Sequence, residues 1–202
     1  MLKRQSLWVP VIKHNPIFAK AFHEFKKSSP ITNLLFNGAR ISEEVIHVAL
    51  DTDAQNPNRS VTALMAFPML VHEDLCEGTG SDERKALACG IEVGLSDAMN
   101  SIHMMERLLP EKTPNVSVNM HAESLKPIHA GDRILVISSI DKFGKGLVYF
   151  KTDFYLEPQS VSEEILARER DITSLQGLHA ALNLYEKLAH VVHLKCILKS
   201  KK

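Results

Sequence analysis

A long apolar segment, residues 87–109, constrains the fold more than any other part of the sequence. Large side chains recur in it at alternating steps of four and three residues: Ile91, Leu95, Ala98, Ile102, Met105 and Leu109. This spacing predicts a helix with one continuous apolar stripe. The other sides of the helix also carry apolar residues, so we expect it to be buried on most sides. Asp97 lies in its middle, and a buried carboxylate there requires a partner or a function.

The composition narrows the class of protein. With 202 residues the chain suits one domain with terminal extensions, and its zero net charge argues against nucleic-acid binding. Three irregularly spaced cysteines (Cys76, Cys89 and Cys196) indicate reduced, intracellular thiols. His190 and His193 have helical spacing but lack an obvious third ligand, so no metal site is predicted. No apolar run approaches the roughly 18 residues of a membrane-spanning helix.

The amino-terminal segment, residues 1–28, is basic and poor in acids. Its first 27 residues carry six lysines and arginines against a single acid, Glu24. This composition is typical of a mitochondrial presequence, although Pro10 and Pro16 interrupt any long helix and a basic tail is the alternative. We therefore expect an extension with a short helix at residues 16–27 and a mitochondrial location, with a cytoplasmic one as the alternative.

Alternating apolar and polar residues predict strands after the central helix, at residues 116–125, 133–141, 147–156 and 165–173. Before the helix, residues 31–36 and 44–50 are strand candidates. Residues 61–71 are either a strand or a buried loop, because Pro68 disfavours a central strand. Ser81 and the two acids that follow it resemble a helix start, so the central helix could begin there.

Residues 178–198 return to a helical period and predict a carboxyl-terminal amphipathic helix. Its stripe consists of Leu178, Leu182, Tyr185, Ala189, Val192 and Cys196. One buried helix followed by an antiparallel meander predicts an α+β fold, in which a curved sheet wraps around a helix. The long edges of such a sheet predict pairing with a second copy of the chain.

Residues 31–174 resemble the hotdog-fold acyl-CoA thioesterases, in particular the branch with the phenylacetate-degradation type and thioesterase superfamily member 2. The most specific match is the segment 115–120 followed by Leu125-Lys126-Pro127 and Ala130-Gly131-Asp132-Arg133. Gly90 and Asp97 also resemble the start of the family's central helix, where an acid follows a glycine by seven residues. The resemblance implies a hotdog domain at residues 29–175, with the helix of residues 176–202 outside it.

The resemblance also implies a site. Asp97 would act as general base or nucleophile on the thioester, and Ser117 would orient the attacking water or the carboxylate. Amides near Gly90 at the helix start would stabilise the oxyanion. In the family the acid of one subunit faces the helix start of another. Lys126 and Arg133 are candidates for binding the phosphates of coenzyme A.

The chain departs from the family pattern at the helix start. Family members usually carry His-Gly-Gly where this chain has Ala88-Cys89-Gly90. If the helix began at Ser81, helical hydrogen bonds would occupy the Cys89 and Gly90 amides.

The sequence is therefore compatible with two functions. The first is an acyl-CoA thioesterase without metal or redox cofactor, acting as a homodimer or dimer of dimers. The second is an inactive hotdog subunit that docks in a larger mitochondrial assembly.

Overall fold

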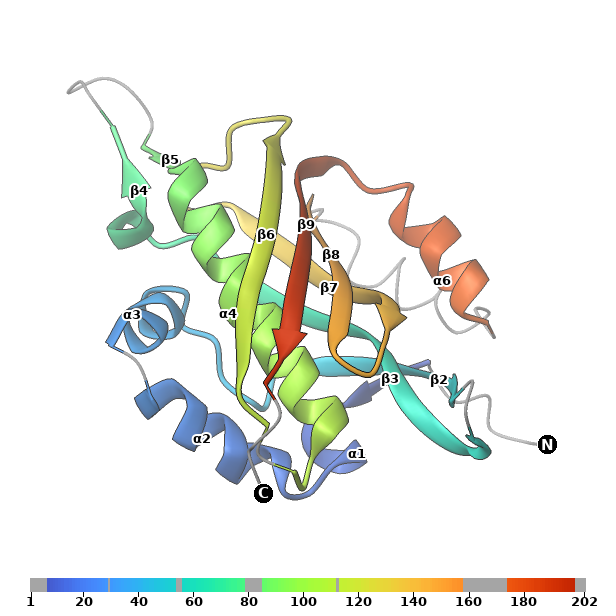
Figure 1. Ribbon diagram of the computed structural model, residues 1–202. Helices are drawn as coiled ribbons and strands as arrows, with labels where there is room; N and C mark the ends of the chain where they lie inside the picture. The colour runs from blue at the N-terminus through green and yellow to red at the C-terminus, as the bar shows by residue number, and fades with distance from the viewer. Residues whose placement is uncertain are drawn as a thin grey trace.

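The computed structural model describes residues 7–28, 30–53, 56–78, 85–111, 113–157 and 174–198. It confirms the α+β hotdog fold: a curved sheet wraps around a long helix, α4 (Cys89–Leu108) (Figure 1). Within the described residues the sheet has the strand order β1-β2-β3-β7-β8-β9-β6, and every neighbouring pair is antiparallel. The strands are β1 (Trp8–Pro10), β2 (His47–Asp53), β3 (Asn56–Leu70), β6 (Asn115–Ser124), β7 (Arg133–Phe143), β8 (Leu147–Leu156) and β9 (Lys187–Ile197).

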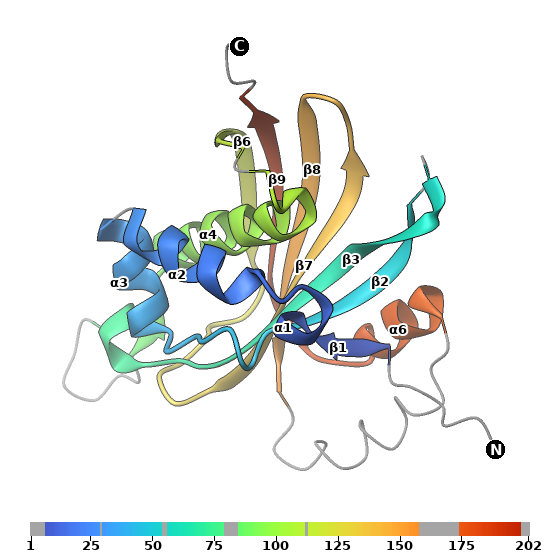
Figure 2. The same cartoon turned by 90° about the horizontal axis from the view of Figure 1, so that it is seen from below.

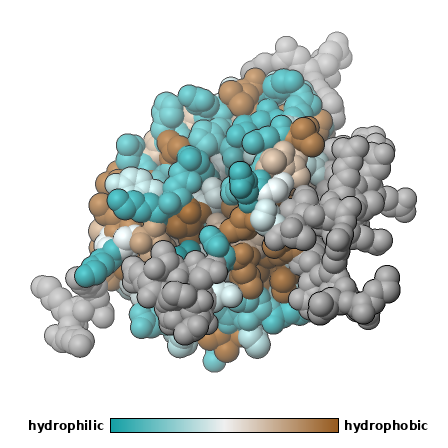
Figure 3. All heavy atoms as spheres, turned by 90° about the vertical axis from the view of Figure 1, so that its right-hand side faces the viewer, coloured by the Kyte–Doolittle hydropathy of each residue, from teal (hydrophilic) through white to brown (hydrophobic). Residues whose placement is uncertain are grey.

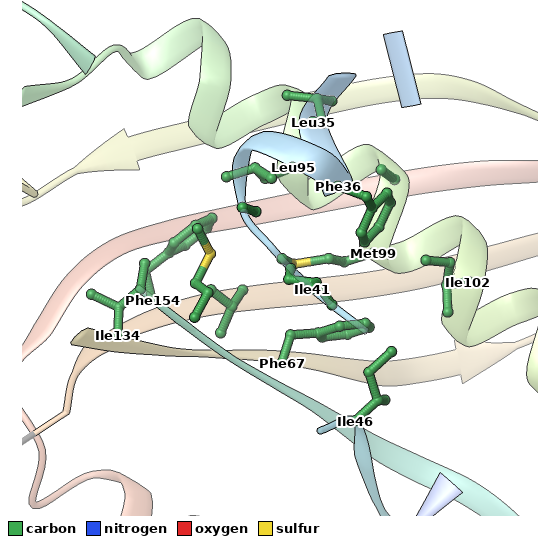
Figure 4. Close-up of a cluster of buried hydrophobic side chains, with 14 of the residues drawn as sticks. Leu35, Phe36, Ile41, Ile46, Phe67, Leu95, Met99, Ile102, Ile134 and Phe154 are labelled. Carbon is green, nitrogen blue, oxygen red and sulfur yellow. The ribbon is translucent and has the colours of Figure 1, made fainter. Parts of the chain in front are cut away.

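The core lies between α4 and the inner face of the sheet. Leu95 and Ile102 of the predicted helical stripe are fully buried, as is Met99 outside it, and they lie against Phe67 of β3 and Phe154 of β8 (Figure 4). At about 25 cal/mol for each Å² of apolar surface removed from water, this contact is a main source of stability. The predicted central helix is therefore confirmed, and so are the predicted strands at residues 116–125, 133–141 and 147–156.

Residues 7–28 belong to the folded domain rather than to a separate extension, so the expected boundary at residue 28 is wrong. β1 pairs with β2, and α1 (Val11–His14) and α2 (Phe18–Ser28) follow it. Phe18 and Phe22 are fully buried, and Phe22 meets Phe36 edge to face. A targeting segment that is cleaved off cannot include these residues, because their loss would open the core. Figure 2 shows α2 and the next helix, α3 (Pro30–Gly38), beside α4.

Two predictions for the region before α4 need correction. Residues 31–36 form part of a helix, α3 (Pro30–Gly38), rather than a strand; its buried Leu35 and Phe36 pack into the core. Residues 61–71 lie almost entirely in β3, which is an internal strand despite Pro68. Pro68 is tolerated because the pairing with β2 ends at Ala66, so no strand on that side requires its missing N–H group.

The helix α4 begins at Cys89, not at Ser81. A short element η1 (Glu73–Leu75) and the two-stranded pair β4 (Cys76–Glu77) and β5 (Ala86–Leu87) precede it. Ala88 has an extended backbone and caps the helix, and its carbonyl already accepts hydrogen bonds from Ile91 and Glu92. Residues 79–84, which include Ser81, lie outside the described residues.

The predicted carboxyl-terminal helix is also wrong over most of its length. Only α6 (Leu175–Leu182) is helical, and residues 187–197 form β9, which lies between β8 and β6 inside the sheet. The segment can pair on both sides as a strand, and these ladders outweigh the apolar period of 3.6 that suggested a helix. Residues 165–173, predicted as a strand, lie outside the described residues.

The helix α6 covers part of the outer face of the sheet. Its Leu178 and Leu182 are buried against Ala49, Leu64 and Tyr155. Figure 3 views the side of the molecule on which α6 lies and shows hydrophobic areas interspersed with hydrophilic ones. No helix among the described residues is both long and apolar enough to span a membrane.

The burial pattern of β9 allows a test of whether this segment forms a strand or a helix. Val191 faces the core and is fully buried, whereas its neighbour Val192 is only half-buried. We expect Val191→Asp to destabilise the fold by about 3 kcal/mol or more, because it buries an unpaired charge, and Val192→Asp by about 1 kcal/mol. Urea unfolding measures both. A helix with the predicted stripe requires the opposite order.

Candidate functional site

Asp97 lies in the third turn of α4, where the helix faces the ends of β6 and β9. Its Oδ1 accepts a hydrogen bond of 2.6 Å from Ser117 Oγ of β6 and one of 2.7 Å from Lys195 Nζ of β9. Nε2 of His193 lies 3.6 Å from the same oxygen. Among the described residues Oδ2 has no hydrogen-bond partner, and 46% of the side chain is exposed. The carboxylate is therefore held on one oxygen and free on the other.

A β-bulge puts Ser117 on the same face as Asp97. Ser117 pairs with Lys195 and Asn119 pairs with Leu194, so Val118 is an extra residue without a pair. Strict alternation along the strand would place Ser117 on the face opposite to Met120 and Ala122. The bulge shifts the alternation by one residue, so Ser117 shares the inner face with both.

Two residues of β9 that the sequence did not single out as site residues complete the cluster. The Lys195 side chain is only 2% exposed, and its Nζ also donates to Asn115 Oδ1 at 3.1 Å. Burial on its own would raise the pKa of Asp97, but the Lys195 charge and the hydrogen bonds from Lys195 and Ser117 lower that pKa. Burial in turn lowers the pKa of Lys195, while Asp97 opposes this shift. Asp97 is therefore an ionised carboxylate paired with a buried ammonium group.

His193 is a neutral imidazole at neutral pH. Burial, followed by the Lys195 charge, lowers its pKa to about 4. Its Nε2 lies 3.0 Å from Ser117 Oγ, and its Nδ1 lies 3.1 Å from Nδ2 of the buried Asn100. His193 therefore connects the exposed site to polar side chains deeper in the core.

The start of α4 presents free amide groups. Because the helix begins at Cys89, the amides of Cys89 and Gly90 precede the first helical hydrogen bond, and neither has a partner among the described residues. A Cβ added at Gly90 would meet nothing within 4 Å, so this helix end is open to an approaching group. Asp97 follows Gly90 by seven residues, which corresponds to about 10 Å along the helix axis. The two groups of one chain therefore cannot act on the same carbonyl.

The structure does not bring Lys126 or Arg133 to Asp97. Lys126 forms an ion pair with Glu186, and Arg133 Nε lies 2.9 Å from Glu157 Oε2. Both side chains are mostly exposed. Contact of either residue with a ligand stays a prediction from the sequence.

Sequence reasoning thus found Asp97 and Ser117, which the structure joins, and missed Lys195 and His193. The sequence did contain a signal for them. Every second residue of this segment (Ala189, Val191, His193 and Lys195) lies on the inner face of β9, which is the period of a strand. Within the described part of the chain, no group of three His, Cys, Asp or Glu side chains could hold a metal ion.

Known structures share this fold. Thioesterase superfamily member 2 from Mus musculus matches at 18% identity and a TM-score of 0.52, over 88% of this chain and 96% of that one. A thioesterase family protein from Silicibacter pomeroyi matches at 14% identity and a TM-score of 0.55, over 91% of this chain and 99% of that one. The E. coli PaaI protein of the phenylacetic acid degradation operon matches at 9% identity and a TM-score of 0.54, over 91% and 95%.

At these identities the likeness establishes the fold, which is the hotdog fold of thioesterase-superfamily proteins. No protein-family model matches the sequence, and neither does any curated protein. The function therefore has to be argued from the geometry of the site.

The two buried histidines on the polar side of α4 predict how stability depends on pH. Burial lowers the pKa of His103 to about 3, and the pKa of His193 is about 4. Unfolded histidines have a pKa of about 6.5. Between these values the unfolded chain binds protons that the folded chain does not, so stability falls as the pH falls. Each histidine should cost about 2 kcal/mol at pH 5 relative to pH 8.

Urea unfolding at pH 8 and pH 5 measures this loss. In His103→Asn, where the amide can still donate to Ser138, the difference between the two pH values should shrink by about 2 kcal/mol. An unchanged difference in this variant would show that His103 is protonated in the folded state.

Proposed function

We propose that the protein is an acyl-CoA thioesterase whose reacting carboxylate is Asp97. The observation that carries this proposal is the asymmetry of the carboxylate. Lys195 and Ser117 hold Oδ1, while Oδ2 is accessible and has no partner among the described residues. A water molecule can therefore reach Oδ2, while Oδ1 is held in place by the two donors. The hotdog fold, which thioesterases of known structure share, supports the same reaction class.

The chemistry requires no metal or redox cofactor. Asp97 Oδ2 takes a proton from water, and the water oxygen attacks the thioester carbonyl carbon. The carbonyl π electrons move to the oxygen, and this oxyanion accepts hydrogen bonds from amides at a helix start. The C–S bond then breaks, and the proton on Asp97 passes to the leaving thiolate. The products are the free acid and coenzyme A.

We propose further that the site requires two copies of the chain, because the Gly90 amides lie about 10 Å from Asp97 along the same helix. β6 is one of the two edge strands of the described sheet, and its Val118 is 55% exposed. If two β6 strands pair antiparallel about their midpoint, Ser117 of one copy lies beside the far end of the other copy's strand. That far end carries Ser124, which bonds to Glu92 in the first turn of α4. One copy would thus supply the carboxylate and the other the amides.

The open amides at the start of α4 favour an active enzyme over a silent docking subunit. The cysteine that replaces a family glycine keeps its N–H group, and the helix does not extend back over it. A mitochondrial location stays a proposal that rests on the basic composition of residues 1–27.

Asp97→Asn tests the proposed reaction. We expect hydrolysis of acyl-CoA substrates to fall at least about a hundredfold, because the amide cannot accept the proton from water. The variant should also lose stability, since the buried Lys195 ammonium no longer faces a carboxylate. The double variant Asp97→Asn with Lys195→Met removes both charges, so it should regain stability without regaining activity.

A matched control is Asp153→Asn. Asp153 also binds a lysine and a histidine, Lys187 and His190, but it lies on the outer face of the sheet. This variant should keep full activity. Measurable hydrolysis by the wild type, at equal rates in the Asp97 variants, would remove Asp97 from the reaction. A wild type that hydrolyses neither short- nor long-chain acyl-CoA would favour the docking subunit.

Val118→Lys tests the shared site. We expect the wild type to sediment as a dimer or a dimer of dimers, and the charged variant to shift toward monomer and lose hydrolysis in parallel. Leu184→Lys is the control, because Leu184 is 79% exposed and lies in the connection between α6 and β9, not on the β6 edge. Full hydrolysis by a monomer in sedimentation velocity at the assay concentration would contradict a two-copy site.

A further inference from the structure

We propose that Asn100 is a positioning residue for the reaction: acting through His193, it makes the Ser117 hydroxyl donate to Asp97 and so leaves Asp97 Oδ2 as the reacting oxygen. This inference rests on the proposed thioester hydrolysis for its catalytic consequence, and on hydrogen-bond geometry alone for the orientation itself. Asn100 is fully buried and lies less than one helical turn after Asp97 on α4.

The Asn100 amide is oriented with its oxygen toward two hydroxyl groups and its nitrogen toward His193. Its Oδ1 accepts hydrogen bonds from Ser138 Oγ of β7 at 2.7 Å and from Thr152 Oγ1 of β8 at 3.0 Å. The oxygen therefore faces two hydroxyl donors, and Nδ2 faces the third neighbour, His193 Nδ1, at 3.1 Å. Ser138 and Thr152 are themselves fully buried, so no water competes with them for this oxygen.

The amide in turn determines the tautomer of His193. Because Asn100 Nδ2 donates a proton, His193 Nδ1 must accept it and cannot carry one itself. The neutral imidazole then carries its single proton on Nε2, which lies 3.0 Å from Ser117 Oγ. Ser117 accepts this bond, so its own hydroxyl proton is free to point to Asp97 Oδ1 at 2.6 Å.

The opposite tautomer of His193 would disrupt the hydrogen bonds of the site. A proton on His193 Nδ1 would leave Nε2 as an acceptor, and the Ser117 hydroxyl would turn toward it. The serine and carboxylate oxygens, 2.6 Å apart, would then face each other without a proton between them. Lys195 would hold Asp97 alone, and the carboxylate would lose the bond that fixes which oxygen is free. We therefore expect Asn100 to affect turnover without touching substrate.

The chain of bonds continues past Asn100 and is closed to water. His103 Nδ1 lies 2.9 Å from Ser138 Oγ, and the Phe150 ring packs beside both histidines, 5.8 Å from His103 and 6.4 Å from His193 between ring centres.

The test is the tautomer of His193, read by nitrogen NMR of the full chain labelled with ¹⁵N-histidine. A ring nitrogen without a proton resonates far downfield of one with a proton, and a His193→Gln variant assigns the signals. We expect the wild type to carry the proton on Nε2. In Asn100→Asp the new carboxylate only accepts, so we expect Nδ1 to gain a proton. Asn15→Asp is the matched control, because it places the same change beside Glu106, away from His193.

Activity provides the second readout. In Asn100→Asp we expect kcat to fall about ten- to a hundredfold with KM nearly unchanged, which is the loss of one charge-assisted hydrogen bond at Asp97. Asn15→Asp should keep its kcat. A wild-type spectrum with the proton on Nδ1 overturns the proposal even if Asn100→Asp does not fold. A folded Asn100→Asp protein that keeps Nε2–H, or that gains Nδ1–H and keeps full kcat, also overturns it. If the wild type hydrolyses no thioester, the proposed function fails, and the tautomer still decides how Asn100 orients Ser117.

Discussion

A helix enclosed by a sheet has to find partners for every polar side chain that it buries, and this constraint determines how the site is built. α4 carries Asp97, Asn100 and His103 on the side that faces the sheet. Three strands supply the hydrogen-bond partners: β9 provides Lys195 and His193, β7 provides Ser138 and β8 provides Thr152. An unpaired polar group at these positions would cost about 1–3 kcal/mol. The apolar core and the polar chain are therefore two sides of one helix.

The pair of Asp97 and Lys195 shows how charge and burial oppose each other at the edge of this chain. Lys195 is nearly fully buried, whereas Asp97 keeps nearly half of its side chain exposed. The desolvation cost therefore falls mainly on the ammonium group, and the carboxylate is left ionised and accessible. This distribution suits a group that has to exchange a proton with water. A fully buried carboxylate would instead tend to become neutral.

The helices α1, α2 and α6, which lie outside the central helix and the meander, cover parts of the core and of the sheet. α1 and α2 close the core beside α4 with Phe18 and Phe22, while α6 covers the outer face of β2 and β3. Neither cover reaches β6, which stays at the edge of the sheet with most of its side chains exposed. The edge nearest to Asp97 is thus the one left open, and there the fold can accept a second copy of the chain.

The sequence by itself determined the central helix, the strands β6, β7 and β8, and the candidate roles of Asp97 and Ser117. These depend on local periodicity and on short motifs, which can be read without knowing the fold. Only the tertiary structure decided the rest. β9 is a strand because β8 and β6 pair with it on both sides, and Lys195 and His193 reach Asp97 through a separation of nearly a hundred residues. The inward position of Ser117 depends on a bulge, and a bulge is a property of the pairing between two strands, so the sequence of one strand cannot show it.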